Sequence, residues 1–170
     1  MRKKSKYKPK PVMLDNMQFV KSGMMPVTTA VDVVLSFSIA NHDALAAISK
    51  GDGTPANVKT LSHAFITSQS LADLGTGNDW MDELDAAQQA LLQIAVRFQK
   101  WSKVQCTPAE LEALNLGMDI HDAQIQGCTV AQLEKAVKLA QNAIRYNTPS
   151  RRDKAKQTIL RAEQSVANKS

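Results

Sequence analysis

The stretch "TPAELEALNLGMDIHDAQIQG", residues 107–127, decides the fold of this chain. It begins with Thr107, Pro108 and Glu110 in the N-cap, N1 and N3 positions, which is the pattern of a capping box at a helix start. The apolar residues that follow recur at helical spacing and are Leu111, Leu114, Met118 and Ile125. The stretch therefore predicts an amphipathic helix that packs one face into a core.

Two polar side chains interrupt this apolar stripe. At about 100° per residue, His121 and Asp122 project onto the same side of the helix, so we expect both to face inward. The same projection places His42 on the stripe of the helix predicted from Thr28 onward, together with Val31, Val34, Leu35 and Leu45. The third histidine, His63, projects away from the core. Because buried polar groups need partners, we expect His42, His121 and Asp122 to meet each other.

Two interpretations of this polar group remain open. The structural one is a core histidine hydrogen-bonded to an aspartate. The functional one is a divalent-metal site that activates water against a phosphate ester. The chain resembles the helical HD phosphohydrolases in having "NHD" at 41–43, "IHD" at 120–122 and a predicted all-helical body. The final aspartate usual in that family has no clear counterpart, since Asp153 lies in the basic tail, and we favour the structural interpretation.

Capping residues and composition predict helices in the rest of the chain as well. Aromatic residues make up only 5% of the sequence, which favours helices over a large sheet. Four further helices are predicted within 28–51, 54–75, 78–103 and 129–147, with starts at Thr54, at Asn78 or Asp79, and at Thr129 with Gln132. From Ser150 onward the segment is helical by composition but strongly basic, so it forms either a sixth helix or a tail. The fold class predicted is all-α, a compact bundle of five or six helices with an extended basic N-terminal arm.

Three regions follow from this division. Residues 1–27 form an extended arm and a docking segment, residues 28–147 the helical domain, and residues 148–170 a basic C-terminal helix or tail. The lysines and prolines at the start predict an extended arm. The following "MLDNMQFVKSGMMPV" at 13–27 is apolar but broken by a glycine and a proline, so we expect a short turn or a single helical turn that packs on something. Its four methionines are typical of packing residues, and they could also dock in the groove of a partner.

The net charge of +5 conceals a division along the chain. Residues 1–10 hold six bases and no acid, and residues 145–170 hold seven bases and two acids, whereas residues 11–144 hold eight bases and fourteen acids. Basic ends serve either the backbone of a nucleic acid or the acidic body of the same or a neighbouring subunit. The candidate nucleic-acid or partner contacts are Arg2, Lys3, Lys4, Lys6, Tyr7, Lys8, Lys10, Arg151, Arg152, Lys154 and Lys156. No helix-turn-helix spacing supports sequence-specific DNA binding.

The sequence carries no other motif that is typical of catalysis or cofactor binding. It has no Gly-rich phosphate loop, no nucleophile elbow and no CxxC, so we expect no cofactor and do not favour an enzyme. Cys106 and Cys128 are expected to be free thiols in a reducing compartment. No stretch has the pattern of a signal peptide or the apolar length of a membrane span. These features predict a protein of the cytoplasm that does not enter the membrane.

Four stretches carry a resemblance to known proteins. At "YKPKPVMLDNMQFVKSGMMPV" (7–27), "NHDALAAISKG" (41–51), "DWMDELDAAQQALL" (79–92) and "LNLGMDIHDAQIQGCTVAQLEKAV" (114–137), the chain resembles a group of small proteins encoded by temperate phages and prophages of Gram-negative bacteria. The resemblance implies a host-cell cytoplasm, and it carries no activity or site residue over to this chain. We expect a non-enzymatic accessory protein that binds a host protein, a host defence component or its own copies. The alternatives are sequence-independent nucleic-acid binding through the termini and a helical HD-like metal phosphohydrolase.

Overall fold

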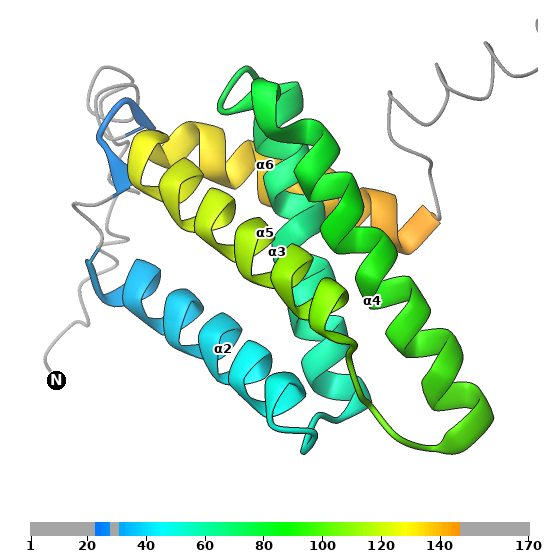
Figure 1. Ribbon diagram of the computed structural model, residues 1–170. Helices are drawn as coiled ribbons and strands as arrows, with labels where there is room; N and C mark the ends of the chain where they lie inside the picture. Colours follow the sequence, from blue (N-terminus) through cyan, green and yellow to red (C-terminus); the bar gives the residue numbers. More distant parts are fainter. Residues whose placement is uncertain (1–22, 28–30, 147–170) are drawn as a thin grey trace, which may run out of the picture.

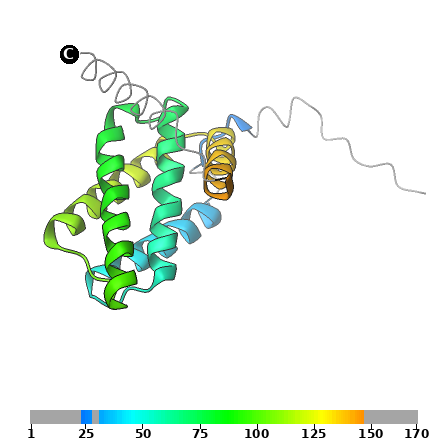
Figure 2. The same ribbon diagram turned by 90° about the vertical axis from the view of Figure 1, so that its right-hand side faces the viewer.

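A central helix, α3 (Pro55–Asp73), packs against each of the other four α-helices that the structure describes. The computed structural model describes residues 23–27 and 31–146. In the second of these ranges it describes side chains only from residue 35 onward. The other helices are α2 (Val31–Ser49), α4 (Met81–Trp101), α5 (Pro108–Gly127) and α6 (Val130–Tyr146). Figure 1 shows α4 and α5 crossing in front of α3, and Figure 2 shows α4 and α6 on opposite sides of it.

The predicted all-α bundle is confirmed for the part of the chain that the structure describes. Its five α-helices match the five predicted with good signals, and a short 3-10 turn, η2 (Asn78–Trp80), precedes α4. Within the described ranges there is no sheet, only two isolated antiparallel bridges, which join Pro26 to Thr129 and Gly53 to Val104. None of the described helices combines the length and the apolarity that crossing a bilayer requires.

The helix starts follow the predicted caps at two threonines. The N–H of Asn57 donates to the hydroxyl of Thr54 at 3.3 Å, and the N–H of Thr54 donates to the Asn57 side chain at 2.8 Å. Thr107 and Glu110 repeat this exchange at the start of α5, also at 3.3 and 2.8 Å. These reciprocal bonds satisfy N–H groups that a helix start otherwise leaves without partners.

The predicted start of α6 at Thr129 is confirmed, and the predicted cap of α4 is wrong. At the start of α6, Thr129 and Gln132 form the same reciprocal pair, at 2.9 and 3.3 Å. Neither Asn78 nor Asp79 caps α4, because both lie inside the 3-10 turn η2. The turn follows Gly77, whose φ of 77° is in the left-handed region that favours glycine. The chain therefore enters α4 through Gly77 and the turn η2, without the side-chain cap that the sequence predicts.

The main core lies where α2, α3, α4 and α5 meet. Its largest fully buried side chains are Ile48, Leu61, Phe65, Ile94, Leu114 and Met118. Gly117 of α5 permits close approach here, since a Cβ at this position would lie 2.7 Å from the Cβ of Ala87 and 3.1 Å from the ring of Phe65. The small residues at this crossing let α5 sit directly on α3 and α4.

Residues 23–27 attach to the start of α6. The N–H of Val27 donates to the carbonyl of Cys128 at 3.1 Å, and the N–H of Val130 donates to the carbonyl of Met25 at 2.9 Å. Val27 is buried in a second, smaller core under α6, together with Leu71, Cys128 and Ala136. These five residues therefore dock on the helical body, whereas residues 13–22 of the predicted docking segment lie outside the described residues.

Several predictions fall on residues 1–22, 28–30 and 147–170, which lie outside the described residues. They include the basic contacts of both termini and the sixth helix. Within the described ranges, thirteen acids stand against eight bases, so this part of the molecule carries a net negative charge. Cys106 and Cys128 are free thiols, as predicted, and burial raises the pKa of both.

Candidate functional site

The polar group predicted from the sequence is centred on His121, whose side chain is buried. His121 is only 5% exposed and lies between α2 and α3. The Asn41 amide nitrogen lies 3.3 Å from its Nε2, and the Ser68 hydroxyl lies 2.7 Å from its Nδ1. An amide nitrogen can only donate, so Nε2 accepts, and Nδ1 carries the proton and donates to Ser68. The ring is therefore neutral, with both nitrogens hydrogen-bonded.

Burial determines the protonation of His121. Removal of the ring from water lowers its pKa to about 4, an effect larger than the opposing influence of the neighbouring Asp122 carboxylate. A histidine with such a pKa stays neutral at the pH of a cell. It supplies a fixed donor and a fixed acceptor that hold α5 to α2 and α3.

His42 and Asp122 form a separate pair near the surface. Their Nε2 and Oδ2 atoms are 2.8 Å apart, and the side chains are 47% and 31% exposed. The structure thus brings His42 and Asp122 together and joins His121 to neither of them by a hydrogen bond. The expectation that His42 faces the core is wrong, because its side chain is half exposed and pairs with Asp122 of α5.

The predicted apolar stripe of α2 is also wrong in part. Leu35 is 54% exposed, and Asn41, Ala44, Leu45 and Ile48 face the core. The side chains of Val31 and Val34 lie outside the described residues. The first half of α2, "VDVVLSFSI", carries apolar residues on every side, so its periodicity does not select one face. Contacts with α3 and α5 select it instead.

No group of three or more His, Cys, Asp or Glu side chains that could hold a metal ion occurs within the described residues. His42, His121 and Asp122 do not converge on one point, because His121 is turned toward Asn41 and Ser68. Asp153, the weak candidate for a further ligand, lies outside the described residues. The geometry of the described residues therefore supports the structural interpretation of this polar group.

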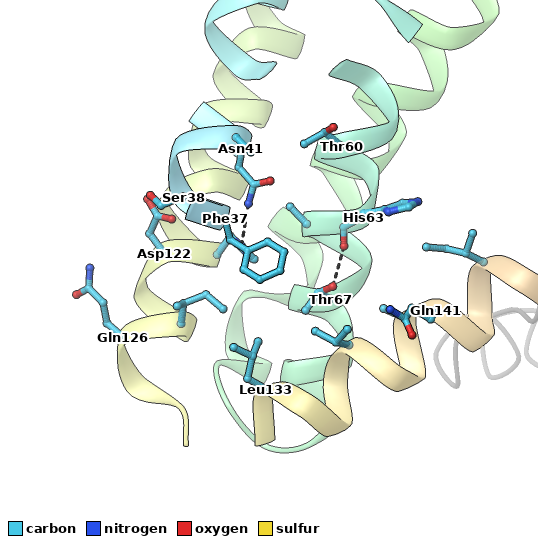
Figure 3. A pocket seen from close by; sticks show the side chains of 17 residues that line it. Phe37, Ser38, Asn41, Thr60, His63, Thr67, Asp122, Gln126, Leu133 and Gln141 are labelled. Carbon is cyan, nitrogen blue, oxygen red and sulfur yellow. Dashed lines mark hydrogen bonds between the residues drawn. The ribbon is translucent and has the colours of Figure 1, made fainter. Parts of the chain in front are cut away.

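Next to this polar group, a groove runs between α2 and α6, with α3 as its floor and the second half of α5 along its side. We call it the α2–α6 groove; its volume is about 450 Å³. The groove exists because α3 packs against α2 and α6, whereas these two helices make no extensive contact with each other. Its main apolar lining residues are Phe37, Ile125, Leu133, Val137, Ala140 and Ile144. Figure 3 shows the ring of Phe37 inside the groove, with Leu133 and Gln141 on the wall formed by α6.

The polar residues of the groove are almost all uncharged. They include Ser38, Thr60, His63, Thr67, Gln126 and Gln141. No Lys or Arg is among the described lining residues, and Asp122, the acid of this set, is paired with His42. Burial, and next the positive charge of Lys59, lower the pKa of His63, which favours its neutral form. The groove can therefore accept apolar side chains and neutral hydrogen-bonding groups, and it is poorly suited to a strongly charged ligand.

Neither the groove nor the partners of His121 were predicted from the sequence. Asn41 and Ser68 come from two other helices, and neither position stands out in the sequence. A signal for the α6 wall exists, since Leu133, Val137, Ala140 and Ile144 follow the spacing of a single helical stripe. No sequence signal marks Phe37, because its exposure of 60% is known only from the structure.

Comparison with known proteins identifies no family for this chain. No family model, no curated protein and no solved structure matches the chain.

Proposed function

We propose that this chain is a non-enzymatic phage accessory protein that binds a host protein through the α2–α6 groove. The observation that carries the proposal is the row of apolar side chains along the groove, above all the exposed ring of Phe37. Large aromatic side chains on a protein surface are typical anchors of protein interfaces. The resemblance to small phage proteins supports a setting in the host cytoplasm, where a component of host defence is one class of partner.

The shape and chemistry of the groove indicate what part of a partner it accepts. A groove between two helices accepts an amphipathic helix, whose apolar side chains at i, i+3, i+4 and i+7 enter as anchors. Neutral polar groups at the rim, such as Thr60 and Gln141, can bond to the polar edge of such a helix. Because the described lining has no Lys or Arg, a helix whose contact face is apolar and uncharged fits best.

The polar group beside the groove supports binding over catalysis. Both ring nitrogens of His121 are used in bonds to Asn41 and Ser68, so the ring is held in one orientation and one protonation state. A general acid or base must exchange a proton with its substrate near the working pH. His121 has the properties of a structural residue that holds the groove wall in place.

A comparison of two matched variants tests this proposal. Phe37→Asp places a charge inside the groove, and Ile39→Asp makes an equivalent change at another exposed apolar position of α2 that is not part of the groove lining. The wild-type protein and both variants are immobilised, exposed to a lysate of a Gram-negative host, and the retained proteins are identified by mass spectrometry. We expect a host protein that wild type and Ile39→Asp retain and that Phe37→Asp loses by about tenfold or more, which corresponds to about 1.4 kcal/mol.

Direct binding of the purified partner must then reproduce this order. Circular dichroism of Phe37→Asp establishes that the helical fold is intact. Equal retention of the same host proteins by all three forms would contradict the proposal, because the groove would then contribute nothing to binding.

A further inference from the structure

We propose that residues 12–20 of this chain occupy the α2–α6 groove in the free protein, so that a partner must displace them. The inference rests on the proposed function, because it assigns a regulator to the same groove. The segment reads "VMLDNMQFV", in which six of nine residues are apolar and one is charged. Its chemistry matches a groove whose lining is apolar and nearly free of charge.

The spacing of the segment suits the groove wall. Met13, Met17 and Val20 are separated by four and three residues, which places them on one face of a helix. On α6, Leu133, Val137, Ala140 and Ile144 form the facing stripe. Nine helical residues extend about 13 Å, and the α6 stripe extends about 16 Å, so the segment fits along the wall. Methionine side chains are flexible and adapt to irregular apolar surfaces.

The attachment point of the segment lies at one end of the groove. Gly23 lies so close to α6 that a Cβ on this glycine would be 3.3 Å from the Cβ of Ala131. Ala131 is two residues before Leu133, the first α6 residue of the groove lining. The three residue steps from Val20 to Gly23 can span about 10 Å, which is about the diameter of a helix. Residues 12–20 can therefore reach the groove of their own chain.

The opposite end of the chain is a poorer occupant. Residues 147–170 follow α6 at the other end of the groove, but only six of these 24 residues are Ala, Val, Ile or Leu. Six of the 24 are Lys or Arg, which match a nearly uncharged lining badly. Charge and apolar density thus both favour residues 12–20.

The test uses the full chain with two double variants of equal charge. Met13→Asp with Met17→Asp places two acids on the predicted contact face, whereas Gln18→Asp with Ser22→Asp places two acids outside that face, one on the far side of the segment and one in the connection to Gly23. The readout is the methyl NMR spectrum, in which Leu133, Val137 and Ile144 report on the groove and Ile48 and Ile94 on the core. We expect the groove methyl signals to shift in the methionine variant alone, with the core signals unchanged in both.

Binding of a synthetic peptide of residues 11–22 provides the second measurement. A short tether gives an effective concentration on the order of millimolar, so an occupied groove in the wild type competes with added peptide. We expect the methionine variant to bind the peptide about tenfold more tightly than the wild type or the Gln18 and Ser22 variant. Groove signals that are identical in the wild type and both variants, with equal peptide affinities, would overturn the inference.

The oligomeric state separates the own chain from a second copy. If the segment binds its own chain, sedimentation shows a monomer and the groove signals do not depend on protein concentration. A dimer that dissociates in the methionine variant would overturn the inference in favour of exchange between copies.

The proposed function is judged separately: if Phe37→Asp abolishes partner capture while the methionine variant leaves the groove signals unchanged, only the inference fails. If the groove signals shift while capture is indifferent to Phe37→Asp, only the proposed function fails.

Discussion

The two sides of α3 face very different surroundings. On one side, Phe65 is completely buried against α4 and α5, next to Gly117. On the other side, Thr60 and Thr67 form part of the floor of the α2–α6 groove, where Phe37 stays exposed. The packed side has the close contacts that stabilise a fold, whereas the groove side exposes apolar surface without them. One helix therefore separates the stabilising half of the molecule from the half that we propose to bind a partner.

The largest expected effect is the loss of the Phe65 ring from the packed side, compared with the loss of the Phe37 ring from the groove side. Phe65→Ala should lower the free energy of unfolding by about 3–5 kcal/mol, because it leaves a cavity in the main core. Phe37→Ala should cost much less, about 1 kcal/mol at most, because the ring is 60% exposed and is covered only by the proposed contact with residues 12–20. Urea denaturation followed by circular dichroism measures both. Similar losses for the two variants would break the distinction between the sides.

A pair of glycine substitutions tests how tightly the packed side is built. Gly117→Ala should destabilise the protein by about 1–3 kcal/mol, because the new Cβ would collide with Ala87 and Phe65. Gly127→Ala, at the end of the same helix, has no heavy atom within 4 Å of the new Cβ and should be neutral or slightly stabilising. Thermal unfolding of both variants decides this. A stable Gly117→Ala protein would mean that the crossing of α5 with α3 and α4 is loose.

The pH dependence of stability tests the buried polar group between the two sides. The pKa of His121 is about 4 in the fold, below its ordinary value of 6.5, so the unfolded chain binds the proton more strongly. The stabilising contribution is therefore complete above pH 6.5 and is lost as the pH falls toward 4. We expect a loss of about 2 kcal/mol between pH 7 and pH 5 in urea denaturation.

Two variants show whether this loss belongs to His121. His121→Asn should be less stable at pH 7 and should lose most of the dependence between pH 7 and pH 5. His63→Gln should keep most of that dependence, because His63 is exposed whereas His121 is buried. Glu110, whose pKa is lowered mainly by its hydrogen bond from Arg97, contributes to acid sensitivity chiefly below its ordinary value of 4.5. An unchanged pH profile in His121→Asn would assign the loss to other groups.

The smallest expected effect concerns the exposed histidine–aspartate pair. His42→Ala and Asp122→Asn should each lower stability by less than about 1 kcal/mol, because water and salt screen charges at the surface. A double-mutant cycle in chemical denaturation gives the coupling between the two side chains. A coupling well above 1 kcal/mol would show that this pair also holds α2 to α5.

Local capping explains why the helix starts were predictable. Thr54, Thr107 and Thr129 each exchange hydrogen bonds with the third residue that follows, and such contacts depend only on neighbours in the sequence. The inward placement of His121 was also predictable, because α5 has a single apolar stripe. The start of α4 was not, because a left-handed glycine and a 3-10 turn replace the expected cap.

What the sequence by itself determined is the set of helices, most of their boundaries and the acidic character of the body, since these depend on local pattern and composition. Only the tertiary structure decided which side of α2 is buried, that His121 bonds to Asn41 and Ser68, and that α2 and α6 leave a groove between them. The partners of His121 are 80 and 53 residues away in the sequence. Such contacts depend on how whole helices pack, and packing is set jointly by side chains from several helices that no local pattern records.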